Sequence, residues 1–267
     1  MPASLTADNK VDYRLQLGDT SVSINECMEK QVKLTFMGAI NCIHCGRKTK
    51  KSFSQGYCFP CMKSLAQCDQ CIMSPERCHY AAGTCREPEW GEQFCMTEHV
   101  VYLANTTAAK VGITRATQIP TRWIDQGAEQ ALPIMRVKTR QQAGFIEDAI
   151  REHISDKTNW RNMLKGSAEP IDLVALKQEL LELSKAKISE VYERFGEDNF
   201  QVDTSQEAQT LSFPVLQYPT KISSFNLDKN PEAEGTLQGV KGQYLIFDTG
   251  VINLRKYTGY QLRLDIA

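Results

Sequence analysis

The sequence predicts an α+β protein of several parts: a zinc-ribbon-like module, an α/β unit with a small, mainly antiparallel sheet, a long helix and a small C-terminal β-barrel. Three observations predict this class. Nine of the ten cysteines lie between Cys42 and Cys95; strand-like and helix-like runs alternate over residues 98–166; and short strand-like runs with turn residues return after Phe213. The chain has 267 residues, which is long enough to form a buried core. Its composition, 24% charged and 42% hydrophobic, excludes a wholly disordered protein.

The boundaries between these parts follow changes of pattern along the chain. Before the cysteines, residues 8–40 carry two alternating runs that predict a small antiparallel sheet. After the α/β unit, an apolar stripe over residues 170–195 predicts one helix that begins at Pro170 and ends at Gly196. The expected parts are an N-terminal β segment (1–40), a cysteine-rich zinc-binding module (41–96), the α/β domain (97–167), a long helical connector (168–200) and a C-terminal β domain (201–267).

No stretch of 18 apolar residues occurs, and the N-terminal residues lack the apolar core of a secretory signal. These observations predict a cytoplasmic protein with no membrane partner. In a reducing compartment, ten cysteines are expected to bind metals rather than to form disulfides.

The formal net charge of -1 hides an uneven distribution. Residues 41–65 contain five basic and no acidic side chains, whereas residues 168–236 contain six basic against thirteen acidic ones. The near-zero total therefore averages a basic front half against an acidic helical stretch, and it does not exclude nucleic acid as a partner.

Two C-x2-C pairs, Cys42/Cys45 and Cys58/Cys61, are separated by twelve residues. Each pair holds two thiolates on one tight turn, and Gly46 allows the backbone angles that such a turn uses. Two such turns close a tetrahedral zinc site with Zn–S distances of about 2.3 Å. Because four cysteines leave no open coordination position, the spacing predicts a structural zinc ion.

A second set of cysteines follows and predicts a second zinc ion. Its expected ligands are Cys68, Cys71, Cys78 and Cys85, of which the first two form another C-x2-C pair. An iron–sulfur cluster would use the same thiolates. Other residues that can replace the last two ligands are His79, Cys95 and His99.

Basic residues lie between the two C-x2-C pairs, where the tip of a hairpin would project. Lys48, Lys50 and Lys51, together with a nearby aromatic ring, are the expected contacts to phosphates and bases, and a solvated lysine-rich turn is the alternative. Arg115 and Trp123 are further candidate nucleic-acid contacts; Trp123 is alternatively a core residue.

A helix predicted over residues 141–153 carries a carboxylate beside its apolar stripe. At about 100° per residue, Glu147 lies about 40° from Ala143 on that stripe. A carboxylate on the buried side is costly unless it is paired or bound to a cation. Glu147 is therefore a candidate metal ligand or a partner of Arg122.

At these positions the sequence resembles the GIY-YIG endonuclease superfamily. Val100-Val101-Tyr102 stands where the GIY strand would be, and Lys110-Val111-Gly112 stands where YIG would be. Arg122 and Glu147 match the arginine and the glutamate that follow, over roughly residues 98–155. The second strand resembles the branch that reads K-[IV]-G-x-T, and the chain as a whole is similar to an uncharacterised bacterial family that joins a cysteine-rich segment to such a domain.

The resemblance implies a divalent-metal-dependent phosphodiesterase. Mg2+ or Mn2+ would bind Glu147 and stabilise charge on the phosphate and the leaving oxygen. Arg122 would clamp the scissile phosphate, and Tyr102 would orient or activate the attacking water. One departure is Lys110, which replaces the second tyrosine of the family and would either activate the water or bind a phosphate without cleavage.

We therefore expect a zinc-containing protein that binds DNA or RNA and whose GIY-YIG-like domain hydrolyses phosphodiester bonds. One alternative is a catalytically inactive module that binds nucleic acid or a ribonucleoprotein. A second is a thiol or zinc redox sensor, in which the cysteine cluster would be the active element.

Overall fold

The computed structural model describes all 267 residues, and β6 (His99–Asn105) lies at its centre with every residue buried. Val100 and Tyr102 face one hydrophobic core, whereas Val101 and Leu103 face another. Successive side chains of a strand point to opposite faces, so a strand between two cores needs an uninterrupted apolar run. The apolar run Val100–Ala104, which predicted a strand here, therefore lies between the two hydrophobic cores of the molecule.

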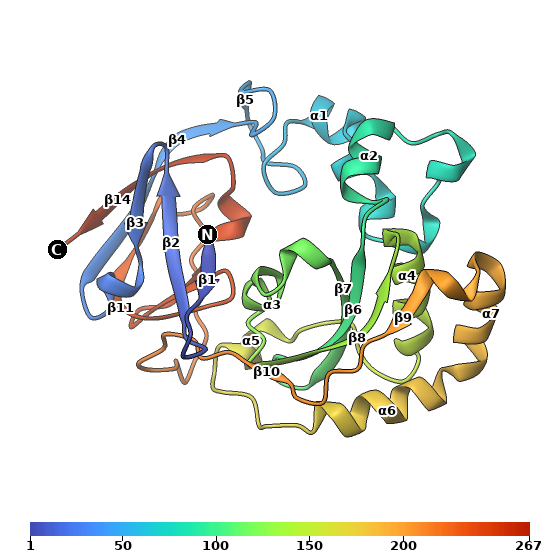
Figure 1. Ribbon diagram of the computed structural model, residues 1–267. Coiled ribbons are helices and arrows are strands. Elements are labelled where there is room, and N and C mark those ends of the chain that lie inside the picture. The colour runs from blue at the N-terminus through green and yellow to red at the C-terminus, as the bar shows by residue number, and fades with distance from the viewer.

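β6 belongs to a five-stranded antiparallel sheet in the order β10-β8-β6-β7, with β9 also paired to β8. Helices α4, α6 and α7 cover one face of it (Figure 1). This confirms an α+β fold with an antiparallel sheet in the middle of the chain. The other strands are β7 (Ala109–Arg115), β8 (Gln130–Val137), β9 (Phe200–Val202) and β10 (Gln209–Thr210).

A second β layer combines the two ends of the chain. Its longest strand, β4 (Gln31–Asn41), pairs antiparallel with β11 on one side and β14 on the other. The expected C-terminal barrel is thus an open, curled sheet that takes its longest strand from the N-terminal part (Figure 1). The other long strands are β11 (Glu232–Lys241), β12 (Tyr244–Phe247), β13 (Val251–Asn253) and β14 (Tyr260–Ile266).

The N-terminal residues form a separate three-stranded sheet in the order β1-β2-β3. Val11 and Tyr13 of β2 are buried in the core that this layer shares with β6, so the N-terminal sheet and the curled sheet enclose one interior. The strands are β1 (Ala3–Leu5), β2 (Val11–Leu17) and β3 (Thr20–Ser23).

The single long helix predicted over residues 170–195 is wrong: two helices, α6 (Leu173–Leu183) and α7 (Lys185–Phe195), meet at Ser184. A straight helix of this length would be about 39 Å long, whereas the eight residues of β8, the longest strand of the sheet it covers, span about 27 Å. The break instead lets both helices pack their apolar residues into one core. The buried Ser184 hydroxyl donates to the carbonyl of Ala149 in α4 at 3.4 Å.

The cysteine-rich segment lies across both layers, at the top of Figure 1. β5 (Lys48–Thr49) pairs antiparallel with the end of β4. α1 (Phe59–Ser64) and α2 (Pro88–Phe94) flank a run of short 3-10 turns. The remaining helices are α3 (Thr121–Asp125), α4 (Arg140–Ile150) and α5 (Trp160–Met163). None of the helices combines the length and apolar composition that crossing a membrane would require.

Candidate functional site

The first four predicted cysteines come together. The sulfur atoms of Cys42, Cys45, Cys58 and Cys61 all lie within 4.8 Å of one another, with Cys45 Sγ 3.7 Å from Cys58 Sγ, and none forms a disulfide. Four thiolates at this spacing could hold a structural metal such as zinc. We refer to these four residues as the cysteine tetrad.

Two different local structures position the cysteine tetrad. Cys42 and Cys45 follow β4 on a turn completed by Gly46, whose φ of +70° favours glycine. Cys58, in contrast, is the residue before α1, and Cys61 lies in its first turn, so the second pair opens a helix rather than a second hairpin. Pro60 explains the difference, because proline suits the first turn of a helix.

Backbone amides stabilise the charged form of one of these thiols. Burial raises the pKa of Cys42, but the amides of Cys45, Cys58 and His44 outweigh burial and lower it to about 6. A thiol that is charged at neutral pH is ready to bind a metal, because the thiolate is the ligand.

The structure divides the second cysteine set. Cys68 packs against the cysteine tetrad, whereas Cys71, Cys78 and Cys85 line a small cavity together with Cys95. His99, another candidate, is fully buried in β6, where its Nδ1–H donates to the carbonyl of Thr97 at 2.7 Å. A separate group of Asp69, Cys71 and His79 has its ligand atoms within 4.8 Å of one another.

A cleft of about 620 Å³ runs along β7, the edge strand of the central sheet. α3 and α4 contribute to its sides, and the cysteine-rich segment contributes Pro75, Trp90 and Phe94. Seven cationic and five carboxylate side chains line the cleft, so it carries a net positive charge. Such a lining favours an anionic ligand that also has apolar surface.

Three of the four predicted catalytic residues, Lys110, Arg122 and Glu147, line this cleft. Lys110 is only 5% exposed and forms no ion pair, and burial, then the charge of Arg122, lowers its pKa to about 8. Burial, then the charge of Asp156, raises the pKa of Glu147 to about 7. The expected alternative for Glu147, an ion pair with Arg122, does not form; the carboxylate instead faces the cleft without a hydrogen-bonding partner.

Tyr102, the fourth, does not line the cleft. Its side chain is fully buried, and its hydroxyl has no hydrogen-bonding partner. Burial raises the pKa of this phenol, so it is neutral. Trp123 is also a core residue, 4% exposed, with its ring 6.1 Å from that of Tyr102.

The predicted nucleic-acid contacts lie at two places. Lys48, Lys50 and Lys51 are exposed on the hairpin of the cysteine-rich segment, outside the cleft lining. Arg115 lies in the cleft, with its guanidinium 4.7 Å from the centre of the Phe94 ring.

The sequence did not assign two of the cleft residues, Arg140 and Arg255, to this site. Arg140 lies seven residues before Glu147 on α4, a spacing that places both on one helix face and could have identified it. Arg255 comes from the turn after β13, more than a hundred residues from Glu147 in the chain, and no local signal places it beside α4.

The fold and the cysteine tetrad define an α+β protein with several antiparallel sheets and a site that could bind a structural metal. The chain belongs to the family described as "Protein of unknown function (DUF2797)", whose profile matches residues 29–262. No curated protein and no solved structure matches the chain.

Proposed function

We propose that this protein binds nucleic acid in the cleft along β7 and hydrolyses a phosphodiester bond there, with the cysteine tetrad as a structural zinc site. The observation that carries the proposal is that Lys110 and Glu147, both largely buried and without ion-pair partners, line the same cleft as Arg122. Unpaired buried charges are costly in a fold and are typical of functional sites.

The three side chains suit the proposed chemistry. Arg122 can bind a phosphate through two parallel hydrogen bonds. Lys110 is partly neutral near pH 8, so it can give a proton to a water molecule beside the phosphate or take a proton from it. The proposed GIY-YIG-like assignment rests on the order of these residues along the chain. The zinc-ribbon-like assignment rests on the two C-x2-C pairs of the cysteine tetrad.

The residues also fit a divalent cation, since Glu147 presents a carboxylate without partners to the cleft. Asp148 and Asp156 line the same cleft, but both of these carboxylates pair with Arg151. Mg2+ or Mn2+ bound there would neutralise charge on a phosphate. Glu147 would hold the cation, and Arg122 and Lys110 would hold the phosphate.

A second candidate, binding without cleavage, is favoured by the burial of Tyr102. The phenol does not reach the cleft lining, so it is not placed to orient a water molecule there. In this case Lys110 and Arg122 would serve only as phosphate contacts, and the partner would be nucleic acid or a ribonucleoprotein.

Incubation of the full chain with branched DNA, single-stranded DNA and structured RNA, with Mg2+ or Mn2+, tests the proposal against Glu147→Gln. We expect metal-dependent products with the native protein and at least 100-fold slower cleavage with the variant, on the scale of losing one charge-stabilising group. Glu152→Gln is the matched control, because Glu152 is exposed, pairs with Lys187 and lies outside the cleft.

The outcomes separate the two candidates. Tight, salt-sensitive binding without products would support the binding module. Absence of binding by both proteins would contradict both candidates and would leave the thiol or zinc redox sensor as the function to test.

A further inference from the structure

The segment from Asp69 to Phe94 has almost no hydrophobic interior. It contributes no buried residue to any of the four hydrophobic clusters of the molecule, and its only buried residues are Pro75 and Gly91. Its backbone consists of three successive 3-10 turns and the short helix α2. Segments that bury so little apolar surface need a covalent or metal crosslink to hold one conformation.

Four thiols from this segment and its C-terminal neighbour converge on one cavity. Cys71, Cys78, Cys85 and Cys95 line it, and none forms a disulfide. Its volume of about 10 Å³ has room for about one small sphere. The four residues approach the cavity from separate turns, namely the 3-10 turns at Gln70–Ile72 and Pro75–Arg77, the loop before α2, and the residue that ends α2.

We propose that Cys71, Cys78, Cys85 and Cys95 hold a second zinc ion that crosslinks this segment. The proposal replaces Cys68 of the expected set with Cys95, because Cys68 packs against the cysteine tetrad and Cys95 lies in the cavity lining. The four sulfurs are not all within 4.8 Å of one another, as those of the cysteine tetrad are, so binding requires rotation of side chains.

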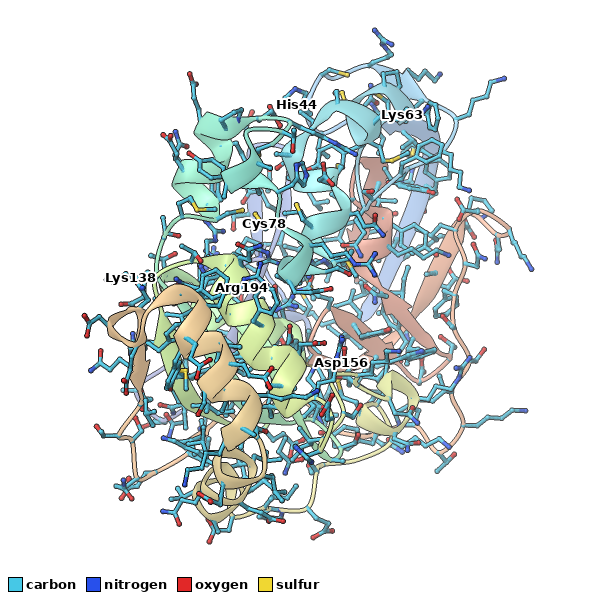
Figure 2. The ribbon with its side chains drawn as sticks, turned by 90° about the vertical axis from the view of Figure 1, so that its right-hand side faces the viewer. His44, Lys63, Cys78, Lys138, Asp156 and Arg194 are labelled. Carbon is cyan, nitrogen blue, oxygen red and sulfur yellow. The ribbon has the colours of Figure 1, made fainter.

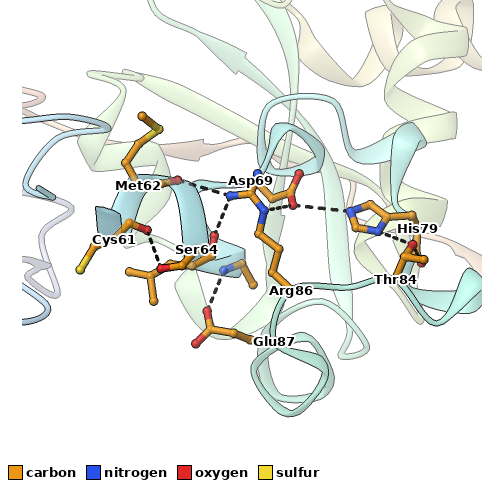
Figure 3. Close-up of polar contacts among 10 residues, drawn as sticks. Cys61, Met62, Ser64, Asp69, His79, Thr84, Arg86 and Glu87 are labelled. Atoms are coloured by element: carbon orange, nitrogen blue, oxygen red, sulfur yellow. Dashed lines mark hydrogen bonds and ion pairs between the residues drawn. The ribbon is translucent and has the colours of Figure 1, made fainter. Parts of the chain in front are cut away.

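In a competing ligand set, Asp69, Cys71 and His79, the carboxylate is already paired with a residue outside the set. The Asp69 carboxylate forms an ion pair with Arg86 Nε at 2.6 Å and lies 3.6 Å from His79 Nε2, whereas His79 Nδ1 lies 2.8 Å from the Thr84 hydroxyl (Figure 3). A guanidinium at this distance neutralises the carboxylate and repels a dication. These contacts instead tie the loop around Arg86 to the turn around Asp69, beside the four-thiol cavity.

The second zinc ion would fix one wall of the cleft. In the view of Figure 2, Cys78 lies below His44 and above Arg194 of α7. The carbonyl of Cys95 accepts from the amide of Arg140 at 2.8 Å, and that of Cys78 accepts from Gln141 Nε2 at 2.9 Å. The backbone carbonyls of two proposed ligands are therefore hydrogen-bonded to the start of α4, the helix that carries Glu147.

The zinc content of the purified full chain, measured by elemental analysis after dialysis, tests the proposal. We expect two zinc ions per chain for the native protein and one for Cys95→Ser. Cys68→Ser and His79→Ala are matched controls and should keep two. One ion in the native protein, or a loss with Cys68→Ser or His79→Ala while Cys95→Ser keeps two, would overturn the proposal.

X-ray absorption at the zinc edge of the native protein covers the case in which Cys95→Ser fails to fold. Two S4 sites give only sulfur neighbours, at about 2.3 Å. A nitrogen or oxygen component in the spectrum would assign the second ion to a set that contains Asp69 or His79, and it would contradict the four-thiol site.

Discussion

Tyr102 and Gly112 lie directly opposite each other in β6 and β7, and a Cβ added to Gly112 would lie 2.9 Å from the Tyr102 hydroxyl oxygen. Gly112 also lines the cleft. The glycine thus provides the space for the buried phenol in a strand that lines the cleft.

We predict that Gly112→Ala lowers the free energy of unfolding by about 1–3 kcal/mol, because the new methyl group overpacks the site of the Tyr102 ring. Urea denaturation measures the change. Gly166→Ala is the control, since a Cβ there meets no atom within 4 Å. Equal stability of the two variants would show that the ring moves freely.

We predict that His99 makes the protein less stable in acid. Burial lowers the pKa of His99 to about 4, below its ordinary value of 6.5, so the unfolded chain binds the proton more strongly. The neutral imidazole therefore contributes stability above pH 6.5 that is lost as the pH falls toward 4. Between pH 7 and 4.5 the native protein should lose about 2 kcal/mol more than His99→Asn.

Urea denaturation at both pH values gives this difference. Loss of zinc in acid affects the native protein and the variant alike, so it cancels in the comparison. Parallel pH profiles for the two proteins would contradict the assignment to His99.

We predict that Glu129→Gln costs about 3–5 kcal/mol, because it leaves the charge of Lys241 buried and unpaired. The Lys241 side chain is 0% exposed and forms an ion pair with Glu129, which joins β11 of the curled sheet to the turn before β8. Lys241→Met combined with Glu129→Gln should be more stable than Glu129→Gln alone. A double-mutant cycle in urea measures the coupling, and purely additive effects would argue against it.

We predict that replacing Lys48, Lys50 and Lys51 with alanine reduces the salt dependence of nucleic-acid binding. Each lost phosphate contact lowers the slope of log K against log salt concentration by about 0.7–0.9, so the slope should fall by about 2 to 3. Fluorescence anisotropy over a range of salt concentrations measures it. An unchanged slope would mean that the phosphates contact the cleft and not these lysines. In that case Arg115→Ala should reduce the slope by about 1.

Local pattern predicted the elements whose signal lies in neighbouring residues. The apolar run at Val100–Ala104 gave β6, and the two C-x2-C pairs gave the cysteine tetrad, because short spacing fixes where the sulfurs can point. Helix periodicity alone indicates Glu147, with Arg122 as its expected partner. Lys110, in contrast, is indicated only by a resemblance that spans residues 98–155.

What the sequence could not predict depends on contacts between distant segments. Alternation in β4 indicated a strand but not its partners, which lie near the other end of the chain. Likewise, Ser184 gave no signal of a break, because the apolar stripe continues on both sides of it. The grouping of Cys95 with Cys71 needs the fold, since C-x2-C spacing favours Cys68.

The pairing of β4 with β14 has a consequence for how the chain acquires its structure during synthesis. Thr35 of β4 pairs with Arg263 of β14, which is synthesised more than 200 residues later. At typical rates of translation this delay is on the order of 10 seconds or more. The central five-stranded sheet, complete at Thr210, can assemble first, so the curled sheet closes late in folding and β4 would spend that interval with an unpaired edge.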